Sequence, residues 1–349
     1  MAAATIASPQ GERVVRPQFT ASAGEYFRIW IVNLLFSLLT LGIYSAWAKV
    51  RKRRYFYGST RLDGATFDYF ASPKAVLKGR ILAAGIVAIY ALTTELYPNS
   101  RFGFWVAGLI LLPWLGVRAY AFNARNSGWR GVRFDFVAGT VKAARTYAAM
   151  VAIVAVTLGL AFPWFMARMK SFVVSNHAFG TARLECRLRG RDFFGIYFLA
   201  GLIVAVIGAP LAFGASWLVM RRQYPDEIAG MILLLPAVPV YAAYLVGYAY
   251  SESRTTNLLW NNTHGPGVRF ESSLSALRMT WLYLGNVLAV IFSAGLLMPW
   301  AVIRTRRYRL SCLSMLVRGE PVYEASASLP RVGAMGQELG DFFNVDLGI

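Results

Sequence analysis

The sequence predicts an all-α, polytopic membrane protein, and three observations lead to this prediction. Of the 349 residues, 57% are hydrophobic, and they gather in long uncharged blocks rather than on one face of polar helices. A helix that crosses a membrane needs about 20 such residues, because the hydrocarbon core is about 30 Å thick and each residue rises about 1.5 Å. About seven blocks approach or reach this length, and three of them end in the same pattern of residues.

The strong positive charge has two interpretations. The chain carries 36 lysines and arginines against 17 acidic residues, a net charge of +19. Such a balance is typical of nucleic-acid binding, but basic loops that face anionic lipid at the cytoplasmic surface produce it equally well. Because the cations lie almost wholly beside the apolar blocks, we expect anionic membrane lipids as partners and no nucleic acid.

The chain begins with a small, polar segment, residues 1–23, which lacks the pattern of a signal peptide and is expected to be disordered. The first apolar block covers residues 29–48 and runs into a basic loop. Within that loop the side chains alternate around Asp63 and Gly64, a pair typical of a two-residue β-hairpin turn. We therefore expect a membrane helix followed by a local hairpin.

Six further apolar blocks follow, and short polar turns join two neighbouring pairs of them into helical hairpins. The blocks cover residues 81–97, 102–122, 146–167, 193–220, 228–251 and 279–303. After Arg318 the chain turns acidic, and this stretch is too short to form its own core. The predicted domains are a tail (1–23), a membrane domain (24–319) of repeated units 24–80, 81–192 and 193–319, and an acidic tail (320–349).

The first, fourth and seventh blocks end in an internal repeat. A glycine is followed five residues later by a tryptophan, and then by an arginine, a second cation and an aromatic residue, which stand four, six and eight residues after the tryptophan. The copies are Trp47, Arg51, Arg53 and Tyr55; Trp164, Arg168, Lys170 and Phe172; and Trp300, Arg304, Arg306 and Tyr308. Positions four apart share a helix face, so each copy predicts a stripe at the membrane surface. The stripes either anchor the protein and contact lipid headgroups, or bind an anionic substrate.

One stretch of the chain resembles a known family. The segments EYFRIWIVNLL, LTLGIYSAWAKVR and RRYFYGSTRLDG, all within residues 24–69, are similar to the signature of the YjgN-like family of bacterial inner-membrane proteins of unknown function. The order of apolar blocks over roughly residues 24–319 fits the same family. The resemblance implies multi-pass residence in the inner membrane, and it implies no catalytic residue, substrate or cofactor.

Two topologies fit the apolar blocks. If all seven blocks cross the membrane, 23 cations lie on the cytoplasmic side and 13 outside; if the first, fourth and seventh are re-entrant, only Arg101, Arg221 and Arg222 of the 36 lie outside. The re-entrant arrangement gives the stronger cytoplasmic bias that membrane proteins show, and the repeated glycine offers a break point. However, non-helical backbone at membrane depth must be buried in protein or line a cavity. We take seven crossings as the working hypothesis and keep the re-entrant arrangement as the alternative.

The remaining polar residues indicate few chemical sites. Asn33 and Asn286 each stand nine residues before a repeat glycine, near the middle of their blocks, where we expect an interhelical hydrogen bond or, as the alternative, a contact with substrate. The chain has two histidines and two cysteines, without metal-ligand spacing, so we expect neither a metal nor a cofactor. The leading hypothesis is a protein that binds or transports a small or lipidic anionic ligand. The alternative is a structural or regulatory scaffold without transport, and we expect no enzymatic activity.

Overall fold

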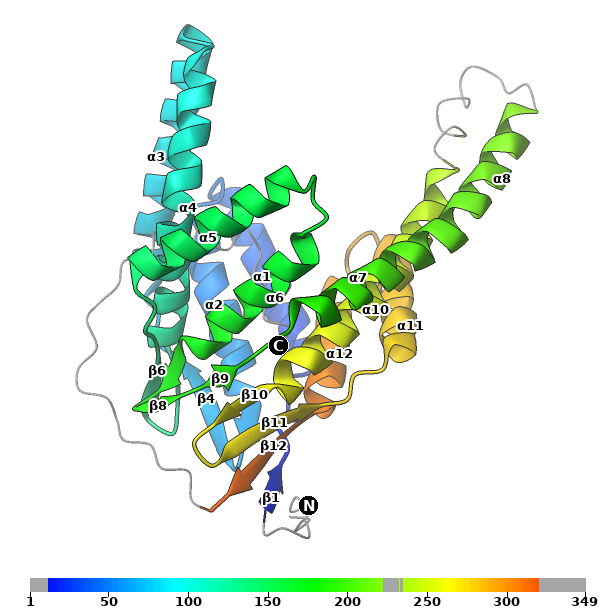
Figure 1. The fold of residues 1–349 in the computed structure, drawn as a ribbon. Helices are drawn as coiled ribbons and strands as arrows, with labels where there is room; N and C mark the ends of the chain where they lie inside the picture. Colours follow the sequence, from blue (N-terminus) through cyan, green and yellow to red (C-terminus); the bar gives the residue numbers. More distant parts are fainter. Residues whose placement is uncertain (1–11, 222–231, 233–234, 320–349) are drawn as a thin grey trace.

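The computed structural model describes residues 12–221, 232 and 235–319, and it is mostly helical. The helices of the described part form antiparallel pairs that stand on a layer of short strands (Figure 1). The pairs are α1 (Ala23–Leu39) with α2 (Ser45–Gly58); α3 (Pro73–Leu96) with α4 (Ser100–Arg125); α5 (Thr140–Val156) with α6 (Phe162–Ser175); the continuous α7 (Gly190–Ile203), η1 (Val204–Gly208) and α8 (Ala209–Met220) with α10 (Ala237–Asn261); and α11 (Ala276–Phe292) with α12 (Met298–Ser311).

The strands of the described residues form two antiparallel sheets, so the prediction of an all-α protein is wrong in this respect. The strands are β1 (Glu12–Val15), β2 (Gln18–Phe19), β3 (Thr60–Leu62), β4 (Ala65–Tyr69), β5 (Ser127–Trp129), β6 (Val132–Phe136), β7 (His177–Phe179), β8 (Ala182–Arg183), β9 (Glu185–Cys186), β10 (Thr263–Gly265), β11 (Val268–Ser272) and β12 (Leu313–Arg318). One sheet has the order β1-β12-β11-β10-β9 and the other runs from β2 to β8 in sequence order. These strands are only two to six residues long, which explains why the sequence did not indicate them apart from the hairpin at Asp63 and Gly64.

The hairpin predicted at Asp63 and Gly64 is present between β3 and β4. Both residues have positive φ, 49° and 77°, as a two-residue turn of this type requires. The same conformation recurs at Arg130 and Gly131, between β5 and β6, with φ of 51° and 76°. Polar loops that looked like simple connections therefore form strand pairs.

The N-terminal segment is structured from residue 12 onward, contrary to the expectation of a disordered tail over residues 1–23. Strand β1 pairs with β12, with Glu12 opposite Arg318 and Val15 opposite Met315. This pairing joins the predicted N-terminal tail to the C-terminal end of the predicted membrane domain. Residues 1–11 and the acidic tail 320–349 lie outside the described residues.

The first, fourth and seventh apolar blocks are not the single helices of the working hypothesis, and each is divided at the repeated glycine, where the alternative arrangement placed a break. The chain reverses between α1 and α2, between α5 and α6, and between α11 and α12, and the two helices of each pair contact one another. The three turns share one backbone conformation. Their φ angles are 49° and 91° at Leu41 and Gly42, 49° and 89° at Leu158 and Gly159, and 48° and 90° at Ala294 and Gly295.

Hydrogen bonds within the three turns are also the same. Each glycine N–H donates to the carbonyl five residues earlier, at 2.7–2.8 Å, which closes the preceding helix in the manner of a Schellman motif. The hydroxyl of Thr40, Thr157 or Ser293 then accepts from the backbone N–H four residues later, at 2.9–3.1 Å. The repeated glycine is therefore needed for the positive φ of a reversal.

Sheet pairing places the loops after the first, third and fourth blocks together. Strand β4 pairs with β5 through Tyr69 and Ser127, and β6 pairs with β7 through Phe136 and His177. Seven crossings would put the β7–β8 loop on the opposite side of a membrane from β3–β4, so the pairing is incompatible with the working hypothesis.

Two helices of the described residues are long and apolar enough to cross a membrane, Pro73–Leu96 and Gly190–Met220. The second packs closely on α10: a Cβ atom added to Gly247 would lie 2.9 Å from the Ala200 carbonyl oxygen. Buried apolar clusters lie mostly where the helices meet the strands, whereas the outer faces and tips of the helix pairs expose large apolar side chains.

Candidate anion-binding cavity

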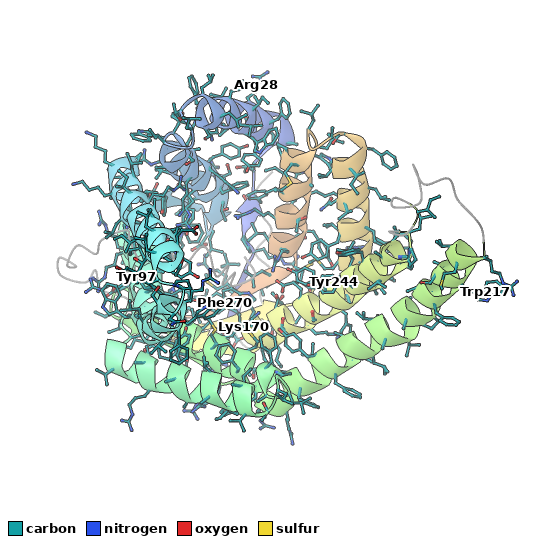
Figure 2. All side chains as sticks on the ribbon, turned by 90° about the horizontal axis from the view of Figure 1, so that it is seen from above. Arg28, Tyr97, Lys170, Trp217, Tyr244 and Phe270 are labelled. Carbon is teal, nitrogen blue, oxygen red and sulfur yellow. The ribbon has the colours of Figure 1, made fainter. Side chains whose placement is uncertain are left out.

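A central cavity of about 1810 Å³ lies between the helix pairs and above the strands. Seen from above, the helix pairs surround this space, with Lys170 and Phe270 beside it (Figure 2). Its walls come from α2, α4, α5, α6, α7, α10 and α12, and its floor from strands of both sheets. It is larger than the roughly 300–1,000 Å³ that is usual for small-molecule pockets.

Three cations that occupy the same position in the three repeat copies line this one cavity. They are Arg53 on α2, Lys170 on α6 and Arg306 on α12. Arg53 donates from Nη1 to the Tyr69 hydroxyl at 2.9 Å, and the guanidinium of Arg306 lies 4.3 Å from the centre of the Phe56 ring. The second cation of each predicted stripe thus faces inward.

Two further lysines of α2, Lys49 and Lys52, also line the cavity. With Arg53 and Phe56 they stand at positions i, i+3, i+4 and i+7, which is one helix face. Partial desolvation at the cavity wall, where Lys52 keeps exposed surface, together with repulsion from Arg306 and Arg53, lowers the pKa of Lys52. A bound anion would offset the repulsion between these cations, so this part of the cavity favours an anionic ligand.

Positive charge exceeds negative charge in the lining. Among the described residues, the lining cations are Arg13, Lys49, Lys52, Arg53, Arg130, Lys170 and Arg306. The two carboxylates of the lining already bind arginine: Asp63 lies 2.8 Å from Arg13 and 2.7 Å from Arg130, and Glu252 lies 2.5 Å from Arg309.

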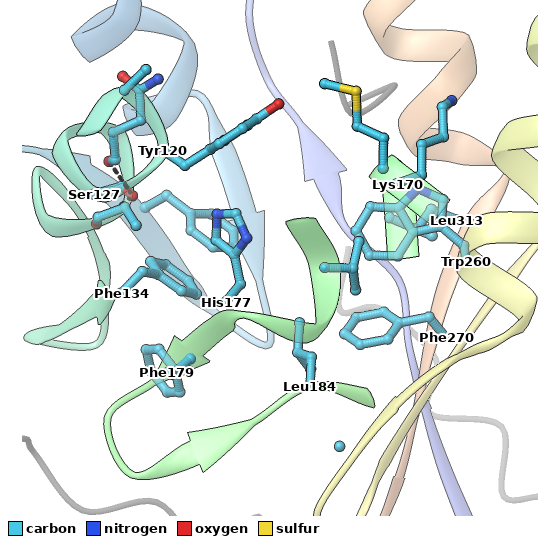
Figure 3. A pocket seen from close by; sticks show the side chains of 18 of the residues that line it. Tyr120, Ser127, Phe134, Lys170, His177, Phe179, Leu184, Trp260, Phe270 and Leu313 are labelled. Atoms are coloured by element: carbon cyan, nitrogen blue, oxygen red, sulfur yellow. Dashed lines mark hydrogen bonds between the residues drawn. The ribbon is translucent and has the colours of Figure 1, made fainter. Parts of the chain in front are cut away.

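Two aromatic side chains add polar groups to the same cavity (Figure 3). The hydroxyl of Tyr120 is buried and makes no hydrogen bond within the described residues, so its hydrogen-bonding capacity is unused there. The Nδ1 atom of His177 donates to the Val173 carbonyl at 2.8 Å, since a carbonyl can only accept. Burial lowers the pKa of His177, which keeps the ring neutral.

The first arginines of the stripes lie outside the cavity. Arg51 and Arg168 are exposed, and Arg304 lies over Trp300, 5.0 Å from the ring centre. Trp47 stacks on Tyr44 at 6.3 Å, whereas Trp164 and Trp300 are exposed on the helix surface. The predicted stripe is therefore divided, with one cation inward and the tryptophan and first arginine on other faces.

The aromatic residues that end the stripes hold each helix pair together. Tyr55 and Tyr308 accept, at 3.0 Å, from the backbone N–H of Ser22 and Ser275, the N-cap residues of α1 and α11. Phe172 has no hydroxyl to accept such a bond, and it packs on the rings of Phe136 and Tyr147 instead.

Asn33 and Asn286 are buried within their helix pairs and do not line the cavity. Asn286 donates to the Thr305 hydroxyl at 2.9 Å and accepts from Arg304 at 3.3 Å, which links α11 to α12. The Oδ1 atom of Asn33 has no hydrogen-bond partner within the described residues.

Comparisons with known proteins identify relatives but no characterised activity. The model of a family described as bacterial protein of unknown function (DUF898) matches residues 15–342. The inner membrane protein YjgN of Salmonella typhimurium is 34% identical over 120 residues, which cover 34% of this chain and 30% of that protein. The protein of the same name from Escherichia coli O157:H7 is 27% identical over 124 residues, with the same shares. The matched part thus spans less than a third of either relative's length, and no solved structure matches.

Proposed function

Because this chain belongs to the DUF898 family of bacterial proteins of unknown function, and relatives are named inner membrane proteins, we propose that it is a multi-pass inner-membrane protein that binds an anionic ligand. The observation that carries the proposal is the convergence of Arg53, Lys170 and Arg306 on one cavity. A scaffold without a ligand would be expected to fill its interior, because protein interiors are close-packed. The proposal is limited to binding, since Asn33 and Asn286 do not meet at a shared site.

The proposed topology has two long hairpins that cross the membrane, α3 with α4 and α7–α8 with α10, and three short ones that enter one leaflet. Residues 29–39, the apolar arm of α1, are eleven residues long, or roughly 16 Å at 1.5 Å per residue, which is about half of the hydrocarbon core. The turns at the tips of the short helix pairs are strongly exposed: Leu41, between α1 and α2, is 95% exposed, and Leu158, between α5 and α6, is 93% exposed. The turn hydrogen bonds satisfy the reversing backbone, as hydrocarbon requires.

Charge distribution supports the same topology. If the strands face the cytoplasm, Arg101 and Arg221 are the only lysines or arginines of the described residues that lie on the far side, as the positive-inside bias favours. The repeat copies are then parallel to one another, so equivalent cations lie at one depth.

Single engineered cysteines test this topology. Cys186 is buried, so the two native cysteines are first replaced by serine. A membrane-impermeant maleimide should label Asn99→Cys in intact spheroplasts, Thr181→Cys only after permeabilisation, and Leu158→Cys only in detergent. Labelling of Thr181→Cys in intact spheroplasts would contradict the arrangement, and Asn99→Cys serves as the control for access.

Variants of the repeat cations test anion binding. The triple variant Arg53→Ala, Lys170→Ala, Arg306→Ala should lose at least about 100-fold in affinity for an anionic ligand, because each cation contributes a charge-assisted contact worth about 1.5–3 kcal/mol. The matched control is Arg51→Ala with Arg168→Ala, which removes two exposed cations from the same helices. The readout is the rise in melting temperature of the detergent-solubilised protein with inorganic phosphate and with lysophosphatidic acid.

Equal responses of the triple variant and the control would refute the cavity as the anion site. The same conclusion would follow if the wild-type protein responded to neither ligand.

A further inference from the structure

We propose that the cavity binds an anionic amphiphile, with its headgroup at the cations and its chain on the sheets. This inference rests on the proposed function and names the class of its ligand. It follows from the way in which polar and apolar groups divide the cavity between walls and floor.

The floor is apolar because alternate residues of its strands point upward. On β12, Leu313, Met315 and Val317 line the cavity, and on β11, Val268 and Phe270 do so. The intervening residues are absent from the lining, as the two-residue period of a strand requires. Strands β11 and β12 thus present apolar side chains to the space beneath the helices.

Aromatic rings cover the part of the floor that the second sheet supplies. Phe134 lies 5.0 Å from Phe179 and 6.4 Å from Phe67, and Trp129 lies 5.7 Å from Phe179, between ring centres. On the other sheet, the ring of Phe270 on β11 lies 5.2 Å from that of Trp260, which belongs to α10. Such a surface offers dispersion contacts to hydrocarbon and few hydrogen bonds.

Five of the lining cations, Lys49, Lys52, Arg53, Lys170 and Arg306, occupy the helical walls instead. The other two, Arg13 and Arg130, belong to the strand layer, where both form ion pairs with Asp63. Figure 3 shows Lys170 with its ammonium directed away from Phe179 and Phe270. Lys170 is itself 6% exposed, and Tyr120 brings a buried hydroxyl that lacks a partner within the described residues. A ligand that satisfies both regions carries an anionic group at one end and a hydrocarbon chain at the other.

The size of the cavity fits such a molecule. At about 1810 Å³ it exceeds what a phosphate ion or a small metabolite fills. Membrane lipids are the source of the chemistry that we favour, and free phosphate is the competing source. The two differ in one measurable property, the dependence of affinity on chain length.

A chain-length series tests the proposal with the full-length protein in nonionic detergent. The ligands are lysophosphatidic acids of increasing chain length, lysophosphatidylcholine of matched length, and inorganic phosphate. We expect affinity to rise up to about four-fold per added methylene until the floor is covered, and the choline analogue to bind at least ten-fold more weakly.

Two double variants separate the floor from the outer surface. Phe134→Ala with Phe270→Ala should flatten the chain-length dependence. Phe194→Ala with Phe198→Ala, a stacked pair exposed on α7 outside the cavity, should leave it unchanged.

A second measurement does not use the floor variant, so it remains informative if that variant misfolds. A lysophosphatidic acid with a brominated chain should quench tryptophan fluorescence more in the wild-type protein than in Trp129→Phe with Trp260→Phe, because both tryptophans line the cavity.

The outcomes distinguish the inference from the proposed function. If phosphate and every lysophosphatidic acid bind equally well, the amphiphile is refuted while the anion site stands. If no anion binds, the proposed function fails. Chain-length dependence that persists in the floor variant, or equal quenching with and without the two tryptophans, would place the chain elsewhere and overturn the inference.

Discussion

Asp63 illustrates how one residue serves both the local turn and the wider structure. It adopts positive φ in the β3–β4 turn, and its carboxylate binds Arg13 and Arg130 from two other segments. The hydrogen bond from Arg13, and then that from Arg130, lower the pKa of the Asp63 carboxyl. The sequence predicted the turn from Asp-Gly alone, but the arginine partners depend on contacts 50 and 67 residues away, which a local pattern does not contain.

Replacing Asp63 by Asn should isolate the contribution of this charge. Asparagine tolerates positive φ, so the turn is retained while both ion pairs are lost, at about 1 kcal/mol for such partly exposed pairs. Because the folded pKa lies below that of the unfolded chain, the stabilisation is present above the unfolded value of about 3.9 and disappears as pH falls through the folded value. Melting temperatures of wild type and variant should therefore differ at pH 7 and converge at low pH. Asp68→Asn, exposed on the same hairpin, is the control, and an unchanged difference at low pH would contradict the explanation.

At the scale of elements, the three short helix pairs show where sequence reasoning succeeded and where it failed. The repeated spacing of glycine, tryptophan and arginine identified the three equivalent segments, and the glycine was recognised as a possible break in the helix. The sequence did not distinguish the cation that faces the cavity from the arginine two residues before it, because the predicted stripe placed both on one surface. Lys49 and Lys52 were missed as site residues although their spacing with Arg53 and Phe56 was visible. The floor was missed because its residues come from strands of two to six residues.

The hydroxyl of Thr157, in the turn between α5 and α6, should contribute measurably to the stability of the protein. Thr157 accepts from the Ala161 N–H at 3.1 Å and donates to the Ile153 carbonyl at 2.8 Å. Thr157→Val keeps the shape but leaves the amide without this acceptor, at a cost of about 1–3 kcal/mol, so the melting temperature should fall. Thr157→Ser is the matched control, since Ser293 makes the equivalent bond in the third copy. Equal melting temperatures for the two variants would show that the hydroxyl is dispensable.

At the scale of the whole molecule, one buried ion pair links the last helix to the fourth pair. The Nη2 atom of Arg309 on α12 lies 2.5 Å from Glu252 on α10, and both side chains are largely buried. With β1 on β12, this contact closes the arrangement of helix pairs around the cavity. Neither contact follows from local sequence, because each joins segments that are distant in the chain.

Glu252→Gln should therefore destabilise the protein strongly. The buried arginine would lose its counter-charge, which costs about 3–5 kcal/mol when one partner of such a pair is removed. The double variant Glu252→Gln with Arg309→Met should recover part of the melting temperature, because no uncompensated charge remains. A double variant that is less stable than Glu252→Gln would show that Arg309 contributes mainly through other contacts.

The shared sheets have a consequence for how helix pairs can be added to such a protein in evolution. Every helix pair of the described part returns the chain to the strand layer, so adding or losing a pair does not change the orientation of anything downstream. A gene duplication of one helix pair with its strands would therefore produce a copy with the same orientation as its parent. Equivalent residues of the copies then lie at the same depth, and a single cation, repeated by duplication, becomes a ring around a common centre.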